Sequence, residues 1–225
     1  MSLPDVDLVV FDLAGTTVED GGEVPAAFTA ALRQFDIAVT ADRLRAVRGA
    51  SKRQAVLDLV PPGADRAARA ERVYAAFCED LAARYAAGGV RAIAGAIDTF
   101  AWLRDRGIRI ALTTGFDRAL TGLLLDALGW AGGTADAVIC GDEVPQGRPA
   151  PYLIFRAMER TRTIDVRRVA TVGDTALDLR AGWHAGVRWN VGVLSGAHDR
   201  RTLEAAPHTQ LLPSVAQLPD LWPAG

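Results

Sequence analysis

Aspartates that follow apolar segments are the residues of this sequence best suited to chemistry. Asp12 ends the apolar run that starts at Leu8, and a second run, from Val169, leads into Asp174 and Asp178. The first run does not alternate between apolar and polar residues, so it is expected to be a strand buried on both faces of a parallel sheet. Ligands bind at the carboxyl ends of such strands, so Asp12 stands where a reactive group is expected. Taken alone, Asp12 could equally cap the turn that follows.

Two further segments supply the other groups that phosphoryl transfer requires. The apolar run 108–114 ends in the hydroxyl of Thr114 before Gly115, and Arg148 lies in the later segment Gly-Arg-Pro-Ala-Pro. Carboxylates hold Mg²⁺ through their oxygens, a hydroxyl and a backbone amide bind phosphate oxygens, and a fixed cation offsets the charge of the transferred group. One aspartate must then be the nucleophile, and Asp12 is the candidate.

Taken in chain order, the four segments resemble the four motifs of the haloacid dehalogenase superfamily, over nearly the whole chain. The resemblance implies that Asp12 becomes an aspartyl-phosphoryl intermediate, with Thr114 as the hydroxyl of the second motif and Arg148 as the cation of the third. It implies a Mg²⁺ cofactor at Asp12, Ala14 (through its carbonyl), Asp174 and Asp178. The residues expected to bind the substrate or its phosphoryl group are Ala14, Gly15, Thr16, Arg48, Gly49, Thr114, Gly115 and Arg148.

Position 14 separates this chain from the ordinary phosphatases of that superfamily. Those enzymes carry a second aspartate two residues after the nucleophile, as a general acid that typically contributes ~10²–10⁴-fold. Here that residue is Ala14, within Asp-Leu-Ala-Gly-Thr, and this stretch resembles the phosphonoacetaldehyde hydrolase (phosphonatase) branch. The resemblance implies cleavage of a carbon–phosphorus bond, in which a lysine forms an imine with the substrate aldehyde and the carbon leaves as an enamine.

The lysine that this chemistry demands is present at position 52. Gly49-Ala50-Ser51-Lys52 resembles the Gly-x-x-Lys pattern of the branch, and Lys52 is the only lysine of the sequence. A guanidinium cannot form an imine, so a single lysine among many arginines favours amine chemistry over a solvated helix residue. Repulsion by the neighbouring Arg48 and Arg53 is expected to lower the pKa of Lys52 and so supply neutral amine.

Several positions depart from the phosphonatase pattern. Arg48 stands where that branch has methionine, Ala55 where it has a histidine thought to relay protons, and Phe116 where it has tyrosine. These departures favour a sister group that acts on a related carbonyl or phosphate compound. Two alternatives therefore stay open: a phosphatase for small phosphate esters, similar to phosphoglycolate phosphatase, and a non-catalytic protein that binds phosphate.

Strand and helix patterns alternate after residue 90, which predicts an α/β fold with a doubly wound parallel sheet. This Rossmann-like core is expected to comprise residues 1–17 and 90–225, with an edge strand and surface packing at 205–222. Residues 18–89 show helix patterns alone, one of them from Lys52 to Leu59, and are expected to form a small helical cap inserted after the first strand. A closing cap would bring Lys52 over Asp12 and exclude water.

Composition limits the partners. A net charge of −2 provides no electrostatic footprint for nucleic acid or an anionic membrane, so a small phosphonate or phosphate is the expected partner. No apolar run approaches the ~20 residues of a membrane span, and the start lacks a signal-peptide pattern, so a cytoplasmic location is expected. Cys78 and Cys140 are expected to be buried free thiols. By resemblance, two copies are expected to pair through their caps.

Overall fold

A six-stranded parallel sheet forms the centre of the molecule, in the order β3-β2-β1-β4-β5-β6. The computed structural model describes residues 5–222, so residues 1–4 and 223–225 at the ends of the expected core lie outside it. The strands are β1 (Leu8–Asp12), β2 (Arg109–Thr113), β3 (Ala137–Ile139), β4 (Val169–Gly173), β5 (Trp189–Val193) and β6 (Gln210–Leu212). The predicted doubly wound parallel sheet is confirmed, and its strand order reverses beside β1.

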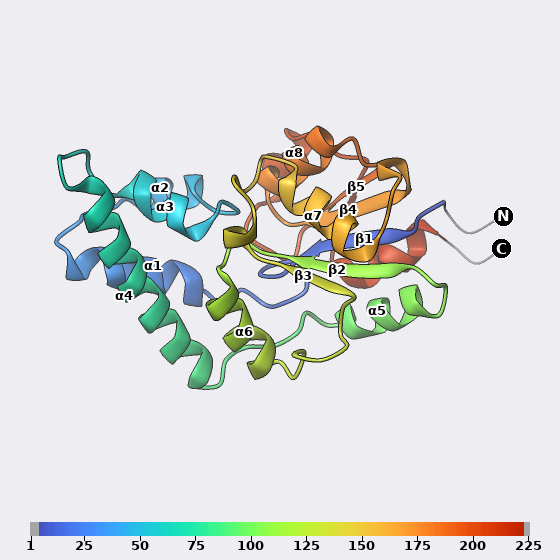
Figure 1. The fold of residues 1–225 in the computed structure, drawn as a ribbon, viewed down its shortest axis with the longest axis horizontal. Coiled ribbons are helices and arrows are strands. Elements are labelled where there is room, and N and C mark those ends of the chain that lie inside the picture. The colour runs from blue at the N-terminus through green and yellow to red at the C-terminus, as the bar shows by residue number, and fades with distance from the viewer. Residues whose placement is uncertain (1–4, 223–225) are drawn as a thin grey trace.

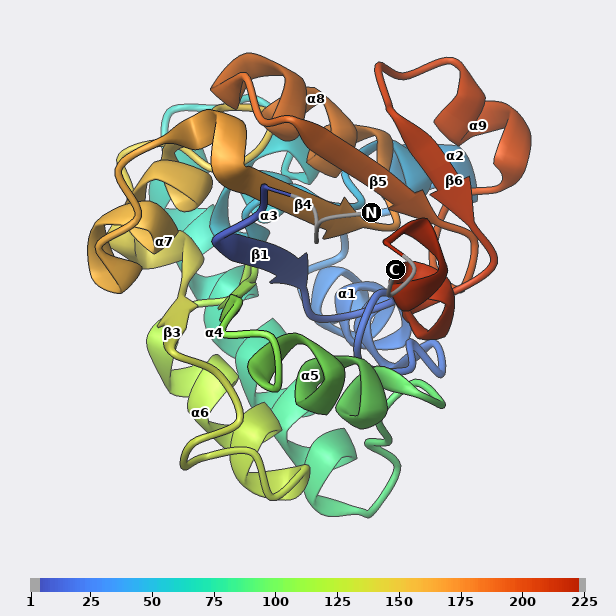
Figure 2. The same ribbon diagram turned by 90° about the vertical axis from the view of Figure 1, so that its right-hand side faces the viewer.

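Both faces of the sheet are covered, which explains the unbroken apolar run of β1. Leu8 and Val10 pack in one cluster of buried side chains, and Val9 and Phe11 pack in another. Figure 2 shows the layers that bury them, with α7 and α8 on one face and α5 with the C-terminal segment on the other. The helices of the core are α5 (Ala96–Arg104), α6 (Arg118–Ala127), α7 (Tyr152–Thr161), α8 (Ala176–Ala185) and α9 (Arg200–Glu204), with short 3₁₀ turns η1 (Gly141–Glu143), η2 (Val166–Arg168) and η3 (Val215–Leu221).

Residues 18–89, all of which the structure describes, contain four helices and no named strand. We call α1–α4 (residues 23–86) the helical insertion. It lies beyond the carboxyl ends of the strands (Figure 1). Its own apolar centre includes Phe28 stacked on Phe77, with ring centroids 4.3 Å apart. The helices are α1 (Glu23–Gln34), α2 (Ala41–Ala46), α3 (Lys52–Leu59) and α4 (Arg66–Ala86).

The two chain segments that join the insertion to the core run side by side. Val18 pairs with Ala92, and the amide of Glu19 donates to the carbonyl of Arg91 at 2.8 Å. Farther along, the hydroxyl of Tyr74 in α4 donates to Asp117 at 2.6 Å, at the start of α6. The insertion is therefore fixed to the core at its connections and also along α4.

The C-terminal segment differs in part from its prediction. β6 is an edge strand, as predicted. The prediction that the rest of this segment packs on the surface was wrong, because Val215, Leu218 and Trp222 are at most 3% exposed. Val215 and Leu218 lie three residues apart, a spacing that suits a 3₁₀ helix, and η3 uses them to cover the sheet face beside α5. The prolines of this segment concealed that spacing.

Two smaller predictions can also be compared with the structure. Both cysteines are free; Cys140 is buried as predicted, whereas Cys78 on α4 is only half-buried. Among residues 5–222, no helix combines the length and the apolar character that crossing a bilayer requires.

Candidate active site

Neighbouring strands bring the polar residues together at one edge of the sheet. Asp12 ends β1 opposite Thr113 of β2, and Asp174 follows β4, the other neighbour of β1. Asp178 reaches the same place from the first turn of α8, which Thr175 caps. The Thr175 hydroxyl accepts a hydrogen bond from the amide of Asp178 at 3.2 Å, and the Asp178 carboxylate accepts one from the amide of Thr175 at 3.1 Å. The strand ends and one helix cap therefore build the carboxylate cluster.

Asp12, Asp174 and Asp178 can each turn one carboxylate oxygen toward a common point, with these oxygens within 4.8 Å of one another. Burial raises the pKa of Asp174 well above its ordinary value, and the charges of Asp12 and Asp178 add to the effect. Burial also raises the pKa of Asp12, to about 6, although Arg148 opposes the shift. A bound cation would offset this repulsion, and oxygen donors suit Mg²⁺, so the three residues fit the expected metal.

Asp174 is held by two donors from distant parts of the chain. Its carboxylate accepts from the hydroxyl of Thr16 at 3.0 Å and from the amide of Ala197 at 2.7 Å. Gly15 approaches so closely that a Cβ there would lie 2.4 Å from an oxygen of Asp174, and its φ of +92° also favours glycine. Thr16, predicted to bind substrate, therefore holds the Asp174 carboxylate, and Gly15, predicted likewise, packs closely against it.

Arg148 is the fixed cation of the site. Its guanidinium contacts Asp12 Oδ1 at 2.8 Å and Asp178 Oδ1 at 2.7 Å, and it donates to the hydroxyl of Thr113 at 2.8 Å. Burial alone would lower the pKa of Arg148, but Asp178 and Asp12 outweigh it and the pKa is raised. The guanidinium of Arg148 therefore stays charged beside Asp12. The sequence analysis assigned Thr114, which directly follows β2, as the hydroxyl of the second motif and did not identify Thr113 as the partner of Arg148.

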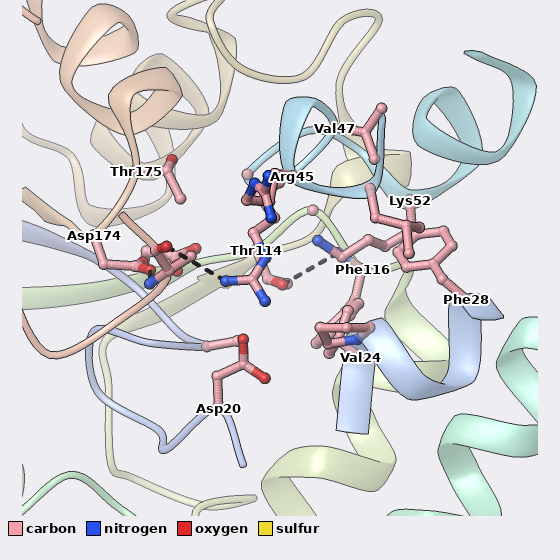
Figure 3. A pocket seen from close by; sticks show the side chains of 18 of the residues that line it. Asp20, Val24, Phe28, Arg45, Val47, Lys52, Thr114, Phe116, Asp174 and Thr175 are labelled. Carbon is pink, nitrogen blue, oxygen red and sulfur yellow. Dashed lines mark hydrogen bonds between the residues drawn. The ribbon is translucent and has the colours of Figure 1, made fainter. Parts of the chain in front are cut away.

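A cavity of about 300 Å³ lies between this sheet edge and the helical insertion. Figure 3 shows it from close by, with Asp174 and Thr175 on the core side and Phe28, Val47 and Lys52 on the side of the insertion. The cavity brings together these residues predicted from the sequence: Asp12, Ala14, Arg48, Gly49, Lys52, Thr114, Gly115, Arg148 and Asp174. Gly15, Thr16 and Asp178 are not in its lining.

Lys52 stands in the first turn of α3, and its Nζ points into the cavity (Figure 3). The Nζ lies 5.2 Å from the centroid of the Phe116 ring and 3.5 Å from the carbonyl oxygen of Ala50. The pKa of Lys52 is lowered, as predicted, but the predicted cause was wrong. Burial is the largest cause, Asp12 opposes it, and the main like charge is Arg148.

Arg53 is not among the main causes, and its guanidinium is engaged elsewhere, in an ion pair with Glu71 and over the ring of Tyr74. Arg48 does line the cavity, and its Nη1 lies 3.4 Å from the carbonyl oxygen of Ala197. The repulsion that lowers the pKa of Lys52 thus comes from the core of the site. Sequence neighbours were a poor guide because Arg53 turns away from Lys52 within α3, and Arg48 belongs to the turn before that helix.

The segment before α3 is pressed against the core. The amide of Lys52 donates to the carbonyl of Gly115 at 3.0 Å, and a Cβ on Gly115 would lie 2.5 Å from the carbonyl oxygen of Ala50. A Cβ on Gly49 would lie 2.4 Å from the hydroxyl of Thr175. Gly49 and Gly115 therefore permit a close approach that would not otherwise fit.

Two charged residues of the cavity were missed by the sequence analysis. Asp20 lies on the segment that joins β1 to α1, and Arg45 lies near the end of α2, exposed and paired with Asp42. The acidic pair Glu19-Asp20, two glycines before α1, was the available signal for Asp20. The sequence does not tell which of these two side chains turns inward.

Comparisons with known proteins agree with this geometry. Residues 6–186 match the family model of haloacid dehalogenase-like hydrolases. A phosphonoacetaldehyde hydrolase of Paraburkholderia phytofirmans is 30% identical over 84% of this chain and 74% of its own length, and one of Bacillus cereus is 30% identical over 86% and 78%. The solved structure of a hydrolase from Pseudomonas syringae superposes with a TM-score of 0.84 at 21% identity, covering 95% of this chain and 96% of that one.

Proposed function

The chain belongs to the haloacid dehalogenase-like hydrolases, and from this premise we propose that it cleaves the carbon–phosphorus bond of phosphonoacetaldehyde or a closely related phosphonate. The observation that carries the proposal is the amine of Lys52, which points into the cavity that Asp12 also lines. Residues 18–89 would act as the cap over a core of residues 1–17 and 90–225.

The reaction begins at the amine. Neutral Lys52 adds to the substrate carbonyl, takes up one proton and expels water, which leaves a protonated imine. Asp12 then attacks phosphorus, the carbon–phosphorus bond breaks, and its electron pair moves toward the imine nitrogen to give an enamine. The enamine carbon takes up a proton, and water hydrolyses the imine to restore Lys52. A second water hydrolyses the aspartyl-phosphoryl group to inorganic phosphate and Asp12.

This route agrees with the alanine at position 14. An enamine needs no proton at the moment when phosphorus departs, so the general acid that an ester oxygen requires has no task here. Arg148, the hydroxyl of Thr114 and the amide of Gly115 would bind the phosphoryl oxygens. Mg²⁺ held by Asp12, the carbonyl of Ala14 and Asp174, with Asp178 in support, would neutralise charge between the nucleophile and these oxygens.

The decisive test measures inorganic phosphate released from phosphonoacetaldehyde with Mg²⁺ present. Wild-type protein should release phosphate, and borohydride added during turnover should leave a covalent adduct on the peptide that contains Lys52. Lys52→Arg, which keeps the charge, should abolish both signals. An active protein without an adduct would contradict imine chemistry.

The rival function, hydrolysis of a small phosphate ester, is separated by the same variants. A phosphatase that uses this site would hydrolyse phosphate monoesters at a rate that Lys52→Arg leaves unchanged, because ester hydrolysis needs no imine. A non-catalytic protein would show no turnover that depends on Asp12. Loss of all phosphate release in Asp12→Asn, with retained folding, would exclude that second alternative.

A further inference from the structure

The cavity contains few groups that can move a proton. Outside the carboxylate cluster and Lys52, its charged lining residues are Asp20, Arg45, Arg48 and Arg148. Guanidinium groups keep their protons at any ordinary pH. Ala14 stands where ordinary phosphatases of the superfamily were expected to carry a general acid, and Ala55 where the phosphonatase branch was expected to carry a proton relay; neither side chain has a proton to give. Asp20 is therefore the one carboxylate of the lining that serves neither as nucleophile nor as metal ligand.

Asp20 is also well placed for such a role. Figure 3 shows its side chain at the cavity, on the side of the segment that enters α1. Its charge acts on Lys52, favouring the protonated amine, and on Tyr85 of α4, whose pKa it helps to raise. The side chain is half-buried, and its Oδ1 accepts from the amide of Gly22 at 3.2 Å, which leaves Oδ2 without a hydrogen bond among the described residues.

Asp20 shares its cavity with the two groups that the proposed reaction uses. Asp12, Asp20 and Lys52 all line the same space of about 300 Å³. A small phosphonate bound between Asp12 and Lys52 would therefore lie in the cavity into which the Asp20 carboxylate faces.

Resting on the proposed function, we propose that Asp20 is the acid–base residue of the imine steps. As Lys52 adds to the carbonyl, Asp20 takes one proton from the nitrogen and passes it to the oxygen. It then passes a second proton, drawn from solvent, to the same oxygen, which leaves as water while the nitrogen lone pair forms the carbon–nitrogen double bond. After the carbon–phosphorus bond breaks, Asp20 delivers the proton that the enamine carbon takes up.

Asp20→Asn tests this role, because the amide oxygen can still accept from Gly22 but the side chain cannot carry a proton. We expect the rate of adduct formation with phosphonoacetaldehyde, trapped on Lys52 with borohydride at set times, to fall about 10²-fold. The pH profile of kcat should differ from that of the wild type. Asp20→Glu should regain part of the rate. Glu19→Gln, whose exposed side chain is outside the cavity, is the matched control and should behave as wild type.

The possible results separate the two proposals. Trapping by Asp20→Asn at the wild-type rate, with an unchanged pH profile, would overturn the role of Asp20 while leaving the proposed function standing. A change confined to KM would also overturn it, because it would assign Asp20 to substrate positioning. Absence of any adduct in the wild type would overturn both. Thermal unfolding of each variant identifies a loss that comes from misfolding.

Discussion

The segment before α3 meets the core at a contact that one methyl group should disturb. A Cβ on Gly115 would lie 2.5 Å from the carbonyl oxygen of Ala50, whereas ordinary contacts begin near 3.4 Å. Gly115→Ala must therefore push the segment before α3 away by roughly 1 Å. The hydrogen bond from the amide of Lys52 to the carbonyl of Gly115, now 3.0 Å long, would then exceed hydrogen-bond distance.

The expected cost falls on catalysis more than on stability. Loss of one such hydrogen bond lowers the free energy of unfolding by about 0.5–1.5 kcal/mol. A shift of about 1 Å in Lys52, in contrast, can reduce turnover about 10²-fold, because the amine no longer meets the carbonyl carbon in a reactive geometry. We therefore expect kcat/KM for phosphonoacetaldehyde to fall about 10²-fold while the unfolding midpoint changes little.

Gly122→Ala is the matched control. Gly122 lies in α6, a Cβ there would meet nothing within 4 Å, and alanine favours a helix by about 0.5–1 kcal/mol. This variant should keep wild-type activity and unfold at a slightly higher temperature. Wild-type kcat/KM in Gly115→Ala would refute the reasoning, because it would mean that the close contact with Ala50 has no part in turnover.

Three further predictions concern the charged groups. Arg148→Met removes the cation between Asp12 and Asp178 and leaves their buried carboxylates unpaired. The free energy of unfolding, measured by urea titration without metal, should fall by about 3–5 kcal/mol. A loss below about 1 kcal/mol would contradict the pairing. Chelation of divalent cations should abolish phosphate release, and added Mg²⁺ should restore it. The variant Asp174→Asn should require a higher Mg²⁺ concentration for the same activity. Activity that survives chelation would count against the metal site. Burial lowers the pKa of Lys52, so neutral amine is present at pH values below the ordinary lysine pKa of 10.5. The rate of adduct trapping should therefore stop rising with pH before pH 10.5 is reached. A rate that keeps rising up to pH 10.5 would show that Lys52 titrates as an ordinary lysine.

Much of the fold follows from patterns that act locally along the chain. The run before Asp12 is a central strand because each of its apolar side chains has a buried face to occupy, and this is visible in the sequence alone. The helix from Lys52 to Leu59 has the predicted bounds, because strong helix formers end at a proline pair. The cluster of Asp12 and Asp174 was likewise foreseeable, since parallel strands end at one edge of the sheet.

The features of the site that the sequence did not predict depend on where individual side chains point in the folded chain. Arg48 and Arg53 were expected to lower the pKa of Lys52 because they are its neighbours in the chain, yet burial and Arg148, far along the chain, have the larger effect. Thr113 and Thr114 are adjacent hydroxyls, and only the fold shows that Thr113 bonds to Arg148 while Thr114 lines the cavity. Residues of loops, such as Asp20, give no periodic signal that marks an inward side chain.

Because the only lysine of the sequence, Lys52, points into the cavity, chemical modification of this one amine reports on access to the cavity. Any reagent that modifies ε-amino groups can react at one side chain only, so mass change of one internal peptide measures access to the site. A ligand that fills the space should shield that amine, and the degree of shielding gives its occupancy without any turnover. Compounds could thus be ranked as occupants before the natural substrate is known.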